Sequence, residues 1–169
     1  MTTEQADLKQ ESLEEAVARL LFLHHLTVTT AESCTGGLLA GRLVNVPGIS
    51  DSFKEGYITY SNEAKEKLLG VSHETLAAYG AVSEETAREM AEGVRNAAGA
   101  DIGIGITGIA GPDGGTAAKP VGLVYIGCCC MGHTTVKRFV FSGDRSQVRQ
   151  SAVEQALTML RIAVLEVEV

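Results

Sequence analysis

The side chains best suited to nucleophilic chemistry gather early in the chain, in residues 29–37. This stretch reads Thr-Thr-Ala-Glu-Ser-Cys-Thr-Gly-Gly, and it lies where an apolar run gives way to a helical pattern of small residues. A junction of this kind exposes a hydroxyl beside helix N-terminal amides that lack partners within the helix. We therefore predict that Ser33 is a nucleophile and that the amides after it stabilise an oxyanion. These amides belong to Cys34, Thr35, Gly36 and Gly37.

Two other interpretations of this stretch stay open. A serine before a helix ordinarily acts as an N-cap, whose oxygen accepts a hydrogen bond from the helix backbone, and Ser33 fits that role too. Cys34 is a rival nucleophile, because a thiol near a helix N-terminus loses its proton more readily. Histidine is the usual base for either residue. The chain's four histidines, however, lie in no stretch that suggests such a partnership: His24, His25, His73 and His133.

Lysine is the alternative base. Residues 57–65 end a predicted strand and open a predicted helix, and they place Lys65 in or near the first helical turn. The helix dipole disfavours a cation there, which lowers the pKa of the amine toward the range that a general base needs. The plainer interpretation is a solvated lysine on a charged helix beside Glu63, Glu66 and Lys67.

A glycine-rich run follows a third predicted strand. Gly103–Gly108 matches G-x-G-x-x-G in form only, because its glycines lie inside the strand and no helix follows. We predict instead that residues 108–115 form a loop whose backbone approaches an anion or a flat ring, with Thr107 at the strand end. An ordinary turn built from Pro-Asp-Gly-Gly is the alternative.

Two arginines open the last predicted helix. Arg145 and Arg149 lie one turn apart and share a helix face. An arginine pair near a helix N-terminus suits a phosphate group. Two surface arginines without a ligand are the alternative.

Hydrophobic periodicity predicts the elements that position these residues. Strands are expected over 27–31, 53–60, 101–107, 121–130 and 133–141, and helices over 4–24, 36–46, 61–69, 72–79, 83–98 and 144–164. Strands interleaved with helices predict a layered α/β fold. The last two strands are separated only by Met131-Gly132, so we expect a hairpin and a mixed sheet of about five strands.

Composition excludes several classes of protein. The chain has 169 residues and 45% hydrophobic residues, which fits one globular domain. A net charge of −7 without a basic stripe argues against nucleic-acid binding. No run is long and apolar enough for a membrane span, and the acidic N-terminus is unlike a secretory signal. Adjacent Cys128, Cys129 and Cys130 are a poor disulfide or zinc framework, which favours a reducing cytoplasm.

The order and wording of several blocks resemble the CinA C-terminal domain family, from about residue 13 to about residue 160. Taken together, the blocks identify this family far more specifically than any single block does. They read Thr-Ala-Glu-Ser-Cys-Thr-Gly-Gly at 30–37, Tyr-Ser-Asn-Glu-Ala-Lys at 60–65, Gly-Ala-Val-Ser at 80–83, Gly-Ile-Ala-Gly-Pro-Asp-Gly-Gly at 108–115, Lys-Pro-Val-Gly at 119–122 and Phe-Ser-Gly-Asp-Arg at 141–145.

The resemblance implies a fold and a reaction. The fold would be a three-layer α/β/α sandwich, with residues 1–169 as one domain. The reaction would hydrolyse the carboxamide of nicotinamide mononucleotide to nicotinic acid mononucleotide and ammonia, without metal or cofactor, in a bacterial cytoplasm. The family's second domain, found before this one in some relatives, finds no room in the chain, so we expect no pyrophosphatase activity. Helices that carry small residues along one face could pack against a second copy of the chain, so we expect a homo-oligomer.

The resemblance also implies roles for individual residues. The family's nucleophile falls on Ser33 and its lysine on Lys65, which would take the proton directly or through Tyr60. The remaining matching positions would bind the nucleotide: Thr107, Gly108 and Gly111 of the glycine-rich run, and Arg145 or Arg149, between which the sequence does not choose.

Three rival functions stay open beside the serine amidase. Acidic side chains at Glu32, Asp51, Asp113 and Asp144 could hold Mg²⁺ in a nucleotide phosphohydrolase, although their spacing fits no metal motif. A nucleotide-binding regulatory module without catalysis is the second rival. A cysteine amidase that uses Cys34 is the third.

Overall fold

A single five-stranded sheet forms the centre of the protein. The computed structural model describes residues 11–167 and orders the strands β2-β1-β3-β4-β5. β1 pairs in parallel with β2 and β3, while β3–β4 and β4–β5 are antiparallel, so the prediction of a mixed sheet is confirmed. The strands are β1 (Val28–Glu32), β2 (Phe53–Ile58), β3 (Ile102–Gly108), β4 (Leu123–Cys130) and β5 (His133–Val140).

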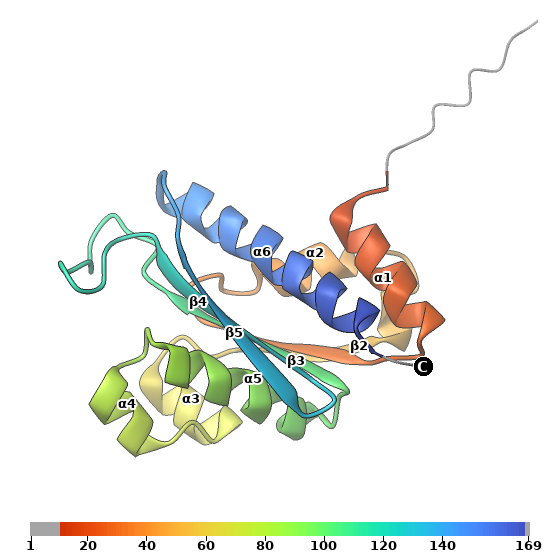
Figure 1. The fold of residues 1–169 in the computed structure, drawn as a ribbon, viewed down its shortest axis with the longest axis horizontal. Coiled ribbons are helices and arrows are strands. Elements are labelled where there is room, and N and C mark those ends of the chain that lie inside the picture. The colour runs from red at the N-terminus through yellow and green to blue at the C-terminus, as the bar shows by residue number, and fades with distance from the viewer. Residues whose placement is uncertain (1–10, 168–169) are drawn as a thin grey trace, which may run out of the picture.

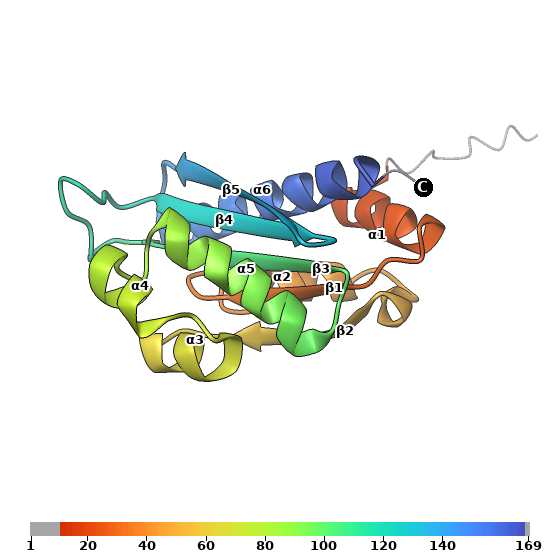
Figure 2. The ribbon, with the colours of Figure 1, turned by 60° about the horizontal axis from the view of Figure 1, so that its bottom comes forward.

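Helices cover both faces of the sheet, which gives the three layers seen in Figures 1 and 2. One face carries α1 (Leu13–Leu23), α2 (Leu38–Val44) and α6 (Arg145–Leu165). The other carries α3 (Asn62–Leu69), α4 (His73–Tyr79) and α5 (Glu84–Ala98). A short 3₁₀ turn, η1 (Ile49–Asp51), precedes β2 and was not predicted. Of the helix expected over 4–24, residues 4–10 lie outside the described part of the chain.

The strand directions bring the chemically interesting segments to one edge of the sheet. β1, β2 and β3 run in parallel, and Glu32 at the end of β1 lies opposite Ile58 of β2 and Ile106 of β3. β5 runs in the same direction as β3, because both are antiparallel to β4. The segments after β1, β2, β3 and β5 therefore leave from the same edge, where ligands of α/β proteins commonly bind.

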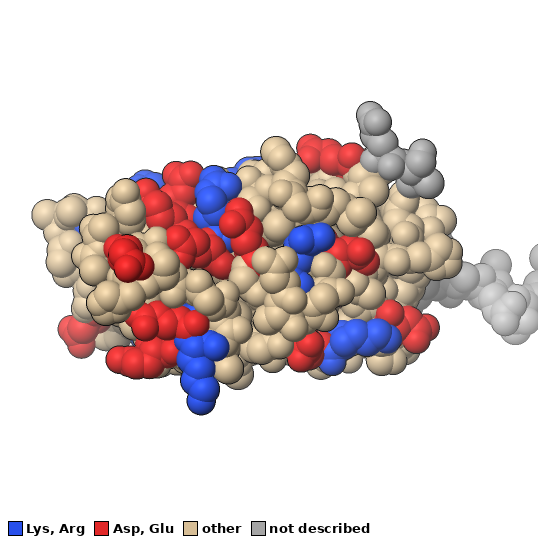
Figure 3. All heavy atoms as spheres, turned by 90° about the horizontal axis from the view of Figure 1, so that it is seen from below, with Lys and Arg blue, Asp and Glu red and all other residues tan. Residues whose placement is uncertain are grey.

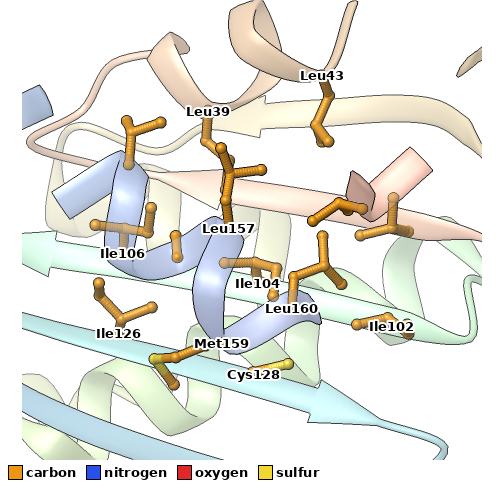
Figure 4. Packing of buried hydrophobic residues seen from close by; sticks show 14 of the residues in the cluster. Leu39, Leu43, Ile102, Ile104, Ile106, Ile126, Cys128, Leu157, Met159 and Leu160 are labelled. Atoms are coloured by element: carbon orange, nitrogen blue, oxygen red, sulfur yellow. The ribbon is translucent and has the colours of Figure 1, made fainter. Parts of the chain in front are cut away.

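The alternating isoleucines and glycines of β3 explain how closely the layers pack. Ile102, Ile104 and Ile106 are fully buried and pack toward α6, as Figure 4 shows. The glycines between them face α5, and a side chain at Gly103 or Gly105 would collide with the helix backbone. Glycine is therefore needed here for the close approach of strand and helix rather than for binding a nucleotide.

The surface of the α3–α5 layer carries acidic side chains interspersed with a few basic ones, and this face shows no broad basic patch (Figure 3). The four cysteines are free thiols, and Cys128 and Cys129 fill opposite faces of β4. Within residues 11–167, no helix combines the length and the apolar character that crossing a bilayer needs.

Candidate active site

A cavity of about 290 Å³ lies at the sheet edge described above. It collects residues from all the segments singled out in the sequence. Those lining it include Ser33, Cys34, Tyr60, Lys65, Thr107, Gly108, Gly111, Asp113 and Arg145. A larger hollow of about 540 Å³ lies between β5 and the end of α6, but its lining is mainly apolar and holds none of these residues.

Ser33 is not an N-cap. Its amide donates to Ile106 O at 3.0 Å, which continues the β1–β3 ladder one residue beyond the strand. α2 begins only at Leu38, and its N-cap is Gly37, which has a left-handed backbone and no side chain to offer. The capping interpretation of Ser33 is therefore wrong. The side chain is 9% exposed and reaches the cavity.

Lys65 lies directly against Ser33. Ser61 caps α3 by accepting from Ala64 N, and the turn that follows carries the lysine into the interior, where it is 1% exposed. Its Nζ donates to Ser33 Oγ at 3.2 Å and to Thr59 O at 2.8 Å. Two junctions separated in the sequence therefore bring a hydroxyl and an amine into contact, and the solvated-lysine interpretation is wrong.

Burial lowers the pKa of the Lys65 amine, because loss of water penalises the ammonium form. Cys34 and, to a smaller extent, the Glu63 carboxylate raise this pKa but do not outweigh burial. The sequence predicted a lowered pKa from the helix dipole, whereas the structure gives desolvation as the main cause. A neutral amine beside a hydroxyl is the arrangement that a general base requires.

Following each N–H of the loop after Ser33 shows which amides are free to bind a ligand. Gly36 N donates to Ser33 O, and Gly37 N donates to the Glu32 carboxylate. The prediction that these two amides stabilise an oxyanion is therefore wrong, and both glycines serve the turn with positive φ. Among the described residues, Thr35 N meets no acceptor, and Cys34 N meets none beyond the side chain of Cys34 itself. Buried amides without a partner are rare, which marks these two as candidate donors to a ligand.

Glu32 is a residue whose role the sequence did not reveal. Its buried carboxylate accepts from the amides of Gly37, Leu39 and Ala40 at 2.9–3.1 Å. It thus caps α2 from the strand behind, which leaves the Ser33 hydroxyl uncommitted. An acidic residue followed by small residues and a helix was the available signal, since a carboxylate suits a helix N-terminus.

The two arginines occupy different places. Arg145 lines the cavity, where it donates to Gly111 O at 2.8 Å and to Tyr60 Oη at 3.1 Å. Arg149 does not line it. Its guanidinium donates to Cys34 O and Thr35 O, each at 3.0 Å. Of the two arginines between which the sequence did not choose, Arg145 thus lies at the cavity and Arg149 lies on the loop carbonyls, which favours Arg145 as the candidate phosphate ligand.

The remaining predicted residues line the cavity in different states. Tyr60 is largely exposed, and its hydroxyl meets Arg145 rather than Lys65. Thr107 is buried and donates to Ala81 O at 2.7 Å. Gly108 and Gly111 bring the loop backbone to the cavity wall. A side chain at Gly108 would collide with Val124 of β4.

Two rival chemistries find little support in these surroundings. Burial raises the pKa of the Cys34 thiol to about 11, so the thiol keeps its proton near neutral pH. Within residues 11–167, no three histidine, cysteine or acidic side chains gather as metal ligands. Glu32 and Asp144 instead spend their carboxylates on backbone amides.

Comparison with known proteins decides the family. A sequence model described as the CinA C-terminal domain matches residues 10–164. The chain belongs to the CinA C-terminal domain family. This CinA-type chain is 61% identical over 150 residues to a Clostridium novyi relative whose name refers to competence damage. It is 58% identical over 156 residues to a CinA-like protein of Kosmotoga olearia. These matches cover 89% and 92% of the chain but only 36% and 38% of the relatives.

Solved CinA structures share the fold. A competence damage-inducible protein from Klebsiella pneumoniae gives a TM-score of 0.89 at 41% identity and covers 92% of this chain and 97% of its own. A competence/damage inducible protein from Agrobacterium tumefaciens gives a TM-score of 0.86 at 42% identity. The match covers 91% of this chain and 96% of the Agrobacterium chain. The sandwich predicted from the sequence resemblance is thus the architecture of the CinA family.

Proposed function

We propose that the protein is an amidohydrolase that converts nicotinamide mononucleotide to nicotinic acid mononucleotide and ammonia. The observation that carries this proposal is the contact between Lys65 Nζ and Ser33 Oγ, at 3.2 Å, inside a cavity that Cys34 also lines. A hydroxyl, an adjacent amine with a lowered pKa and unpaired donors are the parts that acyl transfer needs. Family membership supports the proposal, and the reaction would return pyridine nucleotides to use in the cytoplasm.

The residues suggest an order of steps. Neutral Lys65 accepts the proton of Ser33 while Oγ attacks the carboxamide carbon, and the carbonyl oxygen becomes an anion between the amides of Cys34 and Thr35. The lysine then returns the proton to the leaving nitrogen, the C–N bond breaks and ammonia departs. In the second half, Lys65 takes a proton from water, the resulting hydroxide attacks the acyl carbon, and the lysine returns the proton to Ser33 Oγ as the ester bond breaks.

Binding of the nucleotide falls to the rest of the cavity. The Arg145 guanidinium supplies a cation at the cavity wall, where a phosphate can replace the neutral partners Gly111 O and Tyr60 Oη. The Gly108–Gly111 backbone can lie against the ring or the sugar. Proton transfer needs no help from Tyr60, because Lys65 reaches Ser33 directly.

The proposal is tested by measuring ammonia released from nicotinamide mononucleotide. We expect turnover by the wild type and a loss of roughly 10³-fold or more in Ser33→Ala and Lys65→Ala, as for other nucleophile and base residues. Lys67→Ala is the matched control, because Lys67 is an exposed lysine on the same helix, and it should keep wild-type activity. Wild-type rates in either active-site variant would refute that residue's role. Binding without ammonia release would favour a nucleotide-binding module.

A further inference from the structure

Arg149 lies behind the nucleophile loop rather than in the cavity. It projects from the second turn of α6 and is half-buried. Its Nε donates to Cys34 O and its Nη2 donates to Thr35 O. Among the described residues, it has no carboxylate partner, and its hydrogen bonds go to the two loop carbonyls. A half-buried cation that donates only to backbone carbonyls indicates that Arg149 acts on the conformation of this loop.

Peptide geometry connects the Cys34 carbonyl with the first free amide. The C=O of Cys34 and the N–H of Thr35 belong to one trans peptide, in which the two groups point in opposite directions. A guanidinium that holds Cys34 O on one side therefore aims Thr35 N–H away from α6. It also polarises that peptide, which makes the N–H a stronger donor.

The second contact reaches the other free amide through one more hydrogen bond. Thr35 O, held by Arg149, shares a peptide with Gly36 N–H, which donates to Ser33 O at 3.1 Å. Ser33 O in turn shares a peptide with Cys34 N–H. The guanidinium thus begins two short chains of hydrogen-bonded peptides, and each chain ends at an amide that donates to no other described residue. Hydrogen bonds aligned in this way strengthen one another.

We infer that Arg149 is a positioning residue that orients and polarises the Cys34 and Thr35 amides as an oxyanion hole. This inference rests on the proposed function, in which Ser33 creates the anion that these amides receive. Arg149 touches no substrate in this role, and a phosphate could recruit it only by breaking both carbonyl contacts.

Steady-state kinetics on nicotinamide mononucleotide separate positioning from phosphate binding. For Arg149→Met we expect kcat to fall by roughly 10–10²-fold at an unchanged KM, less than the loss of an oxyanion donor itself. Arg149→Lys, which can reach one carbonyl, should recover part of the rate. Arg161→Met is the matched control, because Arg161 is an exposed arginine on the same helix, and it should leave both constants unchanged. A raised KM with unchanged kcat would identify a phosphate ligand and overturn the inference.

Covalent labelling tests the inference without the proposed substrate. A fluorophosphonate reacts when Ser33 Oγ forms a bond to phosphorus and fluoride leaves, with the hydroxyl proton passing to Lys65 and the P–O charge resting on the oxyanion donors. Intact-mass measurements should show labelling slowed at least several-fold in Arg149→Met, and less in Arg149→Lys. Equal rates in wild type and both variants, or no labelling of the wild type, would overturn the inference.

The two experiments fail in distinguishable ways. If the wild type is labelled and Arg149→Met slows that labelling, but no ammonia is released, the substrate assignment fails and the positioning role stands. If ammonia is released and both Arg149 variants match the wild type in kcat, the amidase stands and the positioning role fails. Thermal melting of each variant shows whether a slower rate reflects a smaller folded fraction, and Arg149→Lys then decides the outcome.

Discussion

Two strand-to-helix junctions build the candidate site, and they use serine in opposite ways. After β2, the chain enters α3 within three residues, and Ser61 spends its hydroxyl on the helix backbone. After β1, five residues separate the strand from α2, and Glu32 caps the helix from behind. Ser33 keeps a hydroxyl free for Lys65 because another residue does the capping. The chemical role of a serine before a helix thus depends on which group accepts hydrogen bonds from the N-terminal amides of that helix.

Outside the Ser33–Lys65 pair itself, the largest effect should come from removing the cap of the first junction. In Glu32→Gln an amide NH₂ group replaces one of the two carboxylate oxygens that together accept from three backbone N–H groups. We expect kcat to fall roughly 10²-fold, because the Ser33 loop loses its shape. We also expect the free energy of unfolding to fall by about 2–3 kcal/mol, as for hydrogen bonds to a buried charge. Ammonia assays and urea titrations measure the two effects.

Ser61→Ala is the matched change at the second junction. The loss of its cap should cost about 1 kcal/mol of stability. Activity should change little, because Lys65 is also held by Thr59 O. If Ser61→Ala harmed turnover as much as Glu32→Gln, the contrast between the junctions would be lost.

The next effect concerns the protonation of Lys65. Since the neutral amine is the base and burial lowers its pKa, kcat/KM should rise about tenfold per pH unit and level off below the ordinary lysine range. Between the lowered pKa and that ordinary range, the unfolded chain holds a proton that the folded protein lacks. The free energy of unfolding should therefore rise with pH across this window relative to Lys65→Met.

Profiles of kcat/KM against pH and urea titrations at several pH values measure these two effects. Lys67→Met, at an exposed position, should follow the wild type in both measurements. A rate that keeps rising through the ordinary lysine range would show that the amine at the second junction is not depressed in pKa.

The smallest effect is expected for Tyr60→Phe. The hydroxyl meets Arg145 and makes no contact with Lys65, so its loss should change kcat by no more than about threefold. KM should rise modestly, because Arg145 loses a partner that holds it at the cavity. Steady-state kinetics measure both constants. A fall in kcat comparable to that of Lys65→Ala would instead place Tyr60 in the proton path.

The sequence predicted the local structure well because local signals set it. Ser61, Ser72 and Ser83 cap their helices, and Gly70 and Gly99 end theirs. The strands followed from β-branched runs, and the layered α/β fold followed from their alternation with helices. The pairing of Ser33 with Lys65, by contrast, came from the family resemblance, since nothing local marks a lysine as buried.

What the sequence could not supply depends on the path of the chain in space. Arg145 and Arg149 share a helix face and a local environment, and only the position of α6 over the loop sends one to the cavity and the other behind it. The roles of Gly36 and Gly37 depend on which amides Glu32 and Ser33 O take up. These contacts join residues that are far apart in the sequence or that meet around a turn, and hydrophobic periodicity does not predict them.

One backbone hydrogen bond has a consequence for how the pair of reactive groups is built. Thr59 N donates to Glu32 O at 2.9 Å, so the residue before the nucleophile is tied to the residue whose carbonyl holds the lysine. The separation of the two groups is thus set by the spacing of neighbouring strands, about 4.8 Å, which is among the least variable lengths in proteins. In design, the spacing of the pair should therefore survive changes elsewhere in the fold, provided that α3 keeps Lys65 hydrogen-bonded to Thr59 O.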